Sequence, residues 1–167
     1  MLELVKHLTT TARLAPEYDF DMVGFNYRMT NLQAAVGCAQ MENLARFVEK
    51  KREVHRYYEE RLAGMMRNGK EISFFLVTEG GSCWFSGFVL PEGCGIEDVR
   101  RIATFLRENG IEGRTFWKPV HLQPMYRECP RSELPVTESI WERIVTLLCS
   151  TGITDEELET VVEVMRR

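Results

Sequence analysis

The sequence lacks several features that mark whole classes of protein. Its 167 residues contain no apolar run that approaches the roughly 20 residues of a membrane span. The N-terminus lacks the basic and then apolar layout of a secretory signal. A net charge of −4 leaves no basic surplus for nucleic acid, and Lys50-Lys51-Arg52 is too short a basic run to bind it. We therefore expect a cytoplasmic protein with no membrane span and no nucleic-acid partner.

The cysteines form no recognisable framework. There are five, an odd number, they are widely spaced, and no Cys-x-x-Cys pair occurs. This pattern argues against a zinc site and against a disulfide scaffold. His7 and His55 belong to no cluster with metal-ligand spacing. We expect free thiols in a reducing compartment and no metal site.

The residues that are present predict an α/β protein of the α+β type. A hydrophobic content of 44% suits an ordinary globular core. We predict a connecting segment over 1–30, a long helix over 31–66, and a small α/β domain over 67–167. Apolar residues spaced three and four apart support the helix, which would be about 50 Å long and would bridge two domains or subunits. Gly37 predicts either a close packing contact on that helix or a simple irregularity.

The C-terminal part predicts a small, mainly antiparallel sheet covered by helices. Two strands, 72–77 and 83–90, would form a hairpin across a loop with two glycines. A helix over 97–108 would be followed by a third strand at 111–117. The apolar positions Val136, Ile140, Ile144 and Val145 predict a further helix that ends near 147. The last helix would start at a capping box formed by Thr154 and Glu157.

The most informative stretch is residues 24–35, Gly-Phe-Asn-Tyr-Arg-Met-Thr-Asn-Leu-Gln-Ala-Ala. Thr30 and Gln33 have the spacing of a capping box, so a helix should begin there. Asn26 and Arg28 lie just before this helix entrance. Because helix N-termini attract anions, the two side chains predict an anion site.

This stretch resembles the signature of the DegT/DnrJ/EryC1/StrS aminotransferases, Gly-Tyr-Asn-x-Arg-Met-x-Asn-hydrophobic-x-Ala-Ala, from which it departs only at Phe25. Further segments resemble the family in the same order along nearly the whole chain. They are Lys6–Arg13, Gly110-Ile111, Arg114–His121, Gln123-Pro124 with Tyr126, and Ser150–Glu157. A local departure is Leu147-Leu148-Cys149-Ser150, where the family often has Leu-Pro-Ser-Ser.

The resemblance implies the C-terminal small domain of a fold-type I enzyme that uses pyridoxal phosphate to aminate nucleotide-linked sugars. In the family the Schiff-base lysine lies upstream of the signature, in a large domain. Only Lys6 precedes Asn26 here, and its surroundings match no lysine motif. Thr78-Glu79-Gly80-Gly81 is similar to the glycine run that follows the family lysine, but its position between two strands marks it as a hairpin turn. We expect no catalytic residue and no bound cofactor in this chain alone.

The resemblance also implies roles for individual residues. Asn26 would bind the cofactor phosphate in the neighbouring subunit of a dimer, and Arg28 would bind the cofactor phosphate or the substrate pyrophosphate, unless it forms a surface ion pair. Four residues would line the nucleotide-sugar site: Arg114, Trp117, His121 and Tyr126. By their residue types alone, Arg114 could instead cap the strand edge, His121 could equally be structural, and the two aromatic residues could belong to the core.

Two functions remain open at this point. The chain is either the C-terminal part of a nucleotide-sugar aminotransferase for surface polysaccharides, including the case of one half of a split enzyme, or a non-catalytic module. In the first case its partner is the missing large domain. In the second case an exposed apolar surface would pair with a second copy or another protein.

Overall fold

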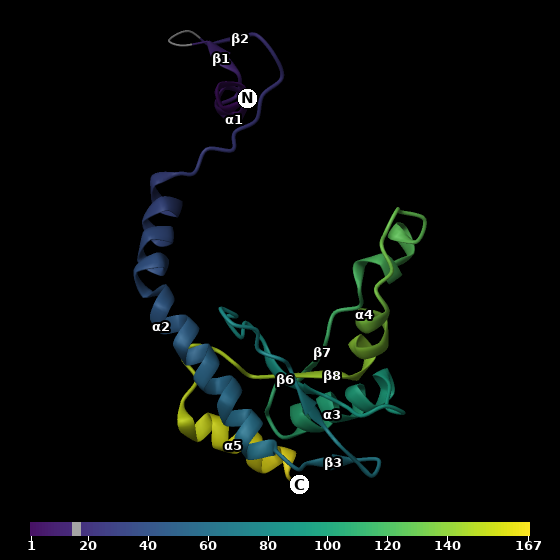
Figure 1. Ribbon diagram of the computed structural model, residues 1–167. Coiled ribbons are helices and arrows are strands. Elements are labelled where there is room, and N and C mark those ends of the chain that lie inside the picture. The colour runs from purple at the N-terminus through teal and green to yellow at the C-terminus, as the bar shows by residue number, and fades with distance from the viewer. Residues whose placement is uncertain (15–17) are drawn as a thin grey trace. The chain divides into compact units, whose positions relative to one another are not determined.

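The computed structural model describes residues 1–14 and 18–167 (Figure 1). These residues form two compact units, Met1–Leu44 and Ala45–Arg167, hereafter unit 1 and unit 2. The predicted division at residues 30 and 66 stays a prediction.

Unit 1 contains a short helix, a small hairpin and the start of the long helix. Helix α1 (Leu2–Thr9) is followed by strand β1 (Arg13–Leu14), which pairs antiparallel with strand β2 (Asp19–Phe20). An extended segment then leads into helix α2 (Asn31–Leu62). The segment predicted to connect therefore carries regular structure of its own.

The backbone of unit 1 turns sharply after α1, and one glycine makes the turn possible. Thr11 and Ala12 adopt positive φ angles of 71° and 54°. A Cβ atom on Gly24 would lie 2.3 Å from the carbonyl carbon of Thr11 and 2.4 Å from the nitrogen of Ala12. Position 24 therefore accepts only glycine without movement of this turn.

Helix α2 begins at the predicted capping box. The Thr30 N–H donates to Gln33 Oε1 at 2.8 Å, and the Gln33 N–H donates to Thr30 Oγ1 at 3.3 Å. The helix ends at Leu62, four residues before the predicted end, because the chain turns there and enters the hairpin of β3 (Met66–Arg67) and β4 (Lys70–Glu71). A Cβ on Gly37 would meet no atom within 4 Å, so the described residues supply no packing contact at this position.

Unit 2 is built on a four-stranded antiparallel sheet. Its strands are β5 (Ser73–Phe74), β6 (Ser86–Val89), β7 (Arg114–Thr115) and β8 (Ile144–Leu147). The order across the sheet is β5-β6-β8-β7. The β5–β6 hairpin confirms the predicted pairing, although both strands are shorter than the patterns at 72–77 and 83–90 indicate.

One predicted helix is wrong. Helix α4 (Pro135–Ile140) ends early, a single turn of 3₁₀ helix, η3 (Trp141–Arg143), follows, and Ile144–Leu147 is strand β8. The spacing of Ile144 and Val145 predicts that both belong to the helix. A short apolar run cannot be distinguished from a buried helical segment by periodicity alone. Pairing with β6 on one side and β7 on the other makes it a strand.

The two remaining helices follow the predictions closely. Helix α3 (Ile96–Glu108) begins where Asp98 Oδ2 accepts from the Gly95 N–H at 2.8 Å. Helix α5 (Asp155–Met165) begins at the predicted capping box, in which Glu157 Oε2 accepts from the Thr154 N–H at 2.9 Å and Thr154 Oγ1 accepts from the Glu157 N–H at 3.2 Å. No helix in the described part of the chain combines the length and the hydropathy needed to cross a membrane.

A single core in unit 2 joins three helices to the sheet. The C-terminal half of α2 runs beside α5 in the same direction, as Figure 1 shows, and ion pairs join Lys50 to Asp155 and Arg61 to Glu159. The Tyr58 hydroxyl donates to the Leu148 carbonyl at 2.8 Å, and burial raises its pKa. The buried side chains come from every layer: Val54, Tyr58, Leu62, Phe88, Val99, Leu106, Val145, Leu147, Leu158 and Val162.

Candidate functional site

Asn26 and Arg28 lie on an extended segment that is tied to the end of α1. The Phe25 N–H donates to the Leu8 carbonyl at 2.7 Å, and the Tyr27 N–H donates to the Thr9 carbonyl at 3.0 Å. The rings of Phe25 and Tyr27 stack, with centroids 5.3 Å apart. Alternate residues of an extended chain face opposite sides, so Asn26 and Arg28 share the side away from this stack.

Both polar side chains are available to a ligand. Asn26 and Arg28 are exposed, and neither has a hydrogen bond or ion pair from its side chain to another residue of the described chain. They lie immediately before the N-terminus of α2. An amide and a guanidinium at a helix entrance are groups that bind phosphate. The structure therefore places both predicted cofactor residues together in unit 1.

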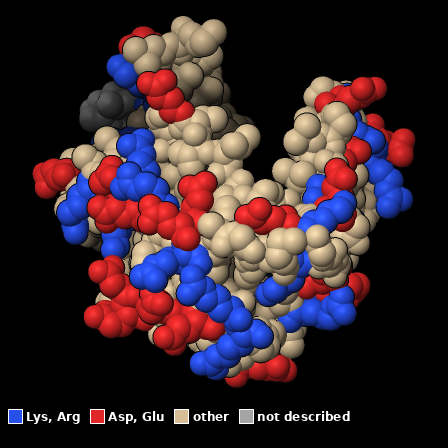
Figure 2. All heavy atoms as spheres, turned by 60° about the horizontal axis from the view of Figure 1, so that its bottom comes forward, with Lys and Arg blue, Asp and Glu red and all other residues tan. Residues whose placement is uncertain are grey.

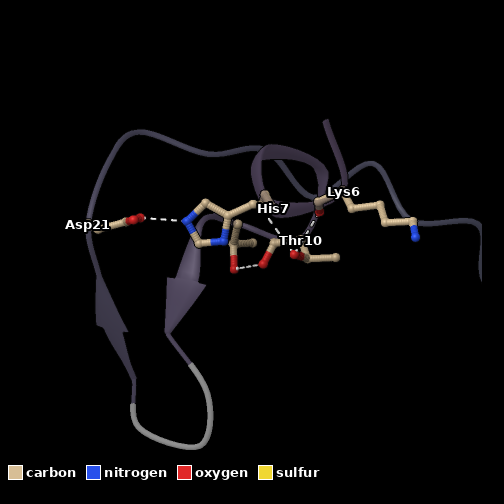
Figure 3. Close-up of polar contacts among 5 residues, drawn as sticks. Lys6, His7, Thr10 and Asp21 are labelled. Carbon is tan, nitrogen blue, oxygen red and sulfur yellow. Dashed lines mark hydrogen bonds and ion pairs between the residues drawn. The ribbon is translucent and has the colours of Figure 1, made fainter. Parts of the chain in front are cut away.

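A histidine–carboxylate contact holds together the elements of unit 1 that precede Asn26 and Arg28. His7 Nε2 lies 2.6 Å from Asp21 Oδ1, which joins α1 to the chain after β2 (Figure 3). The Thr10 hydroxyl donates to the carbonyls of Lys6 and His7 at 2.9 and 3.0 Å. The Lys6 side chain points away from this cluster in Figure 3, and its Nζ lies 3.6 Å from a Glu3 carboxylate oxygen at the surface.

Trp117 is not a core residue but part of an exposed aromatic cluster in unit 2. Its ring packs edge-on against Phe85, with centroids 4.9 Å apart, and lies 6.1 Å from the ring of Trp84. Trp84 and Trp117 are 68% and 60% exposed. Sequence reasoning missed Trp84 and Phe85, although two aromatic pairs, 84–85 just before β6 and 116–117 just after β7, were a usable signal.

The other three predicted substrate residues have different surroundings. His121 lies in the 3₁₀ turn η1 (Val120–Leu122), and its Nε2 is 2.9 Å from Glu138 Oε1. Its side chain is only 10% exposed, so this nitrogen is already engaged. Arg114 on β7 is exposed and pairs with Glu112 at 2.6 Å. Tyr126 ends the 3₁₀ turn η2 (Pro124–Tyr126) and is half-exposed.

A lysine–cysteine contact adjoins the aromatic cluster. Lys51 Nζ donates to the Trp84 carbonyl at 2.9 Å and lies 3.4 Å from Cys149 Sγ. Cys149 also borders a hollow of about 440 Å³ that Ser150 and Glu157 help to line. All five cysteines are free thiols. Lys51 is thus occupied by contacts within unit 2.

The segment that is similar to the family's glycine run is a turn between strands. The Gly81 N–H donates to the Thr78 carbonyl at 2.9 Å, and Arg52 Nε donates to the Gly81 carbonyl at 3.0 Å. The stretch lies between β5 and β6, as predicted. The predicted site residues therefore fall into two sets, Asn26 with Arg28 in unit 1 and the remaining four in unit 2.

Comparison with known proteins identifies the relatives of this chain. A model of the DegT/DnrJ/EryC1/StrS aminotransferase family matches residues 3–166. The chain belongs to this family. A GDP-perosamine synthase from Vibrio cholerae is 33% identical over 148 residues, which cover 86% of this chain and 38% of that protein. The resemblance inferred from residues 24–35 is therefore confirmed.

Solved structures agree with this family assignment at the level of the fold. PseC from Helicobacter pylori, an aminotransferase involved in the biosynthesis of pseudoaminic acid, gives a TM-score of 0.79 at 16% identity. The match covers 96% of this chain and 44% of PseC. The PLP form of a sugar aminotransferase from Streptococcus pneumoniae gives a TM-score of 0.78 at 22% identity, over 96% of this chain and 41% of that one. The predicted α+β fold is confirmed, and the family depends on pyridoxal phosphate.

The chain spans about two fifths of the length of these family members. What the longer proteins do with their remaining residues is therefore not a property of these 167 residues. The comparisons show the family and the fold of this chain.

Proposed function

We propose that this chain acts as the C-terminal part of a pyridoxal phosphate-dependent aminotransferase that works on nucleotide-linked sugars. One observation supports this most strongly: the family model matches residues 3–166, yet the chain spans only about two fifths of the length of its relatives. The residues that react with the cofactor would be supplied by a large domain that these 167 residues do not include. Alone, the chain would not transaminate.

The surface of unit 1 supports this proposal. Among its described residues only Ala12 is buried, although the unit is rich in large apolar side chains. Phe20, Tyr27, Met29 and Leu32 are between 53% and 76% exposed. Apolar surface of this extent normally packs against another protein surface. We assign it to the large domain of the complete enzyme.

The residues present fit one end of the cofactor. Asn26 and Arg28 can bind its phosphate through an amide N–H and a guanidinium beside a helix N-terminus. When bound, pyridoxal phosphate supplies the electron sink that carries the amino group. Two lysines are already engaged elsewhere, since Lys6 pairs at the surface with Glu3 and Lys51 donates to the Trp84 carbonyl.

Unit 2 would contribute to the substrate side. Arg114, Trp117, His121 and Tyr126 stay our candidates for contacts with the nucleotide-sugar. Trp117 and Tyr126 offer exposed aromatic faces for a ring, and Arg114 offers a guanidinium for phosphate. His121 would contribute indirectly, by positioning Glu138, because its Nε2 is already engaged by the Glu138 carboxylate.

The proposal is tested in two steps. First, the chain is mixed with pyridoxal phosphate, reduced with borohydride and examined by mass spectrometry, and no single lysine should carry a stoichiometric adduct. Second, the chain is co-expressed with a large-domain segment that carries the family lysine. The two should copurify and should transfer an amino group to a keto-sugar nucleotide.

A matched pair of variants then tests Asn26. In the associated protein, Asn26→Ala should weaken retention of the cofactor by roughly tenfold or more, the value of a hydrogen bond to a charged group. Gln40→Ala removes an exposed amide of unit 1 outside the signature and should leave retention unchanged. Equal retention in both variants would remove Asn26 from the cofactor site.

A second candidate is a non-catalytic module. The same exposed apolar surface of unit 1 would then pair with a second copy of the chain. Sedimentation of the purified chain distinguishes the aminotransferase part from the non-catalytic module. A stable homodimer that fails to bind the large-domain segment would favour the module.

A further inference from the structure

A hollow lined by arginines lies in unit 2 and contains none of the candidate site residues. Its volume is about 380 Å³, within the range of small-molecule pockets. Three elements line it: β3, α3 and the end of α5. The apolar lining residues are Ile102, Phe105 and Met165, and the arginines are Arg67, Arg101 and Arg166. No acidic side chain lines it within the part of the chain that the structure describes. In Figure 2, which brings this end of unit 2 forward, Lys and Arg side chains lie across the lower face, with Asp and Glu side chains beside them.

Each of the three arginines makes one internal contact, which leaves most of its donors available. Arg101 pairs with Asp98, Arg166 donates to the Arg61 carbonyl at 2.6 Å, and Arg67 donates to the Met66 carbonyl at 3.1 Å. A guanidinium carries five N–H donors in a fixed fork, so one internal bond leaves several for a ligand.

A second, smaller hollow adjoins the first across two of these arginines. Arg67, Arg101 and Ile102 line both, and Leu90 and Cys94 extend the second, whose volume is about 180 Å³. Asp98 also borders it, but its two oxygens are already bonded to Arg101 and to the Gly95 N–H. A paired carboxylate keeps its charge, so Asp98 offsets Arg101, and the shared wall has a net positive charge from Arg67, with apolar surface on either side of it.

The geometry points to a binding site for a nucleoside diphosphate in these two hollows. The diphosphate binds to Arg67 and Arg101, whose forks match phosphate oxygens. The base lies over Phe105, which is 38% exposed, on the floor of the larger hollow. An acidic peptide would need a longer groove than these two hollows provide, whereas a nucleotide matches their size and the separation of charge from apolar surface.

The test uses the full 167-residue chain, with GDP, guanosine and pyrophosphate as probes at low ionic strength. Binding is followed by amide chemical shifts and by calorimetry. GDP should bind saturably, with shifts at Arg67, Arg101 and Phe105. Pyrophosphate should bind more weakly at the two arginines, and guanosine should not bind measurably.

Variants decide whether the arginines form a site. Arg67→Ala and Arg101→Ala should each weaken GDP binding about tenfold, the size of a lost charge-assisted bond. Phe105→Ala should weaken GDP but not pyrophosphate. Arg100→Ala is the matched control, because Arg100 lies on the same helix, pairs with Glu97 and lines neither hollow.

Two results would overturn the proposal. One is the absence of saturable GDP binding up to millimolar concentration. The other is equal weakening by Arg100→Ala and Arg67→Ala, which would mean diffuse attraction to a basic surface. Neither result depends on unit 1 or on pyridoxal phosphate, so the aminotransferase proposal stands or fails separately.

Discussion

Gly87→Ala should destabilise unit 2 severely, although it adds a single methyl group. Gly87 lies on β6 opposite Thr146 of β8. A Cβ at this position would lie 2.1 Å from the Val145 carbonyl oxygen and 3.0 Å from the Thr146 Cα. Because carbon–oxygen contacts are ordinarily about 3.3 Å or more, the two strands would have to separate by about 1 Å.

The magnitude follows from what that separation breaks. Overpacking in a tight interior costs about 1–3 kcal/mol, and a buried backbone group that loses its partner costs about 1–3 kcal/mol more. We expect a loss of roughly 3–5 kcal/mol, a large part of the about 5–15 kcal/mol that stabilises a typical domain. In urea this corresponds to a midpoint lower by about 2 M at an unchanged slope.

Ser86→Ala is the control, one residue away on the same strand. Ser86 is fully buried, and its hydroxyl oxygen has no hydrogen-bond partner among the described residues. Removing an unpartnered buried hydroxyl should leave the stability unchanged or raise it by about 1 kcal/mol. Adjacent substitutions to alanine should therefore act in opposite directions.

Tryptophan fluorescence is the natural assay for this pair of variants. All three tryptophans of the chain, Trp84, Trp117 and Trp141, belong to unit 2, so the signal follows that unit alone. A loss below 1 kcal/mol for Gly87→Ala, or a loss above that for Ser86→Ala, would refute the reasoning from close strand approach.

Three further predictions concern the ends of helices and the turn of unit 1. Gly24→Ala should open the turn after α1, because its Cβ would overlap the Thr11 carbonyl carbon, and faster hydrogen exchange at the Phe25 amide would reveal this. Thr154→Ala should lower the free energy of unfolding in urea by about 1 kcal/mol, because α5 loses its cap. An unchanged free energy would show that the cap does not stabilise the chain. The Gly95 N–H, and then Arg101, hold the pKa of Asp98 below its usual range, so its contribution to stability is present above the unfolded pKa of about 3.9 and disappears as pH falls through the lower folded value. Asp98→Ala should therefore destabilise the chain more at pH 7 than at pH 2, and a pH-independent effect would contradict this origin.

Local sequence signals determined much of this protein. Two capping boxes, Thr30 with Gln33 and Thr154 with Glu157, fixed the starts of α2 and α5, because each depends on residues three apart in the chain. The signature at 24–35 identified the family, because its order of residue types is specific. The β5–β6 hairpin was also visible from the glycines of its turn.

Only the tertiary structure decided the features that depend on distant partners. Ile144–Leu147 became a central strand because β6 and β7 pair with it, while its apolar spacing suited a helix equally well. The aromatic cluster joins residues 84–85 to 116–117, and the arginine hollow joins residue 67 to residues 101 and 166. Such groupings are set by long-range packing, which no local pattern encodes, whereas helix starts and family signatures are written in neighbouring residues.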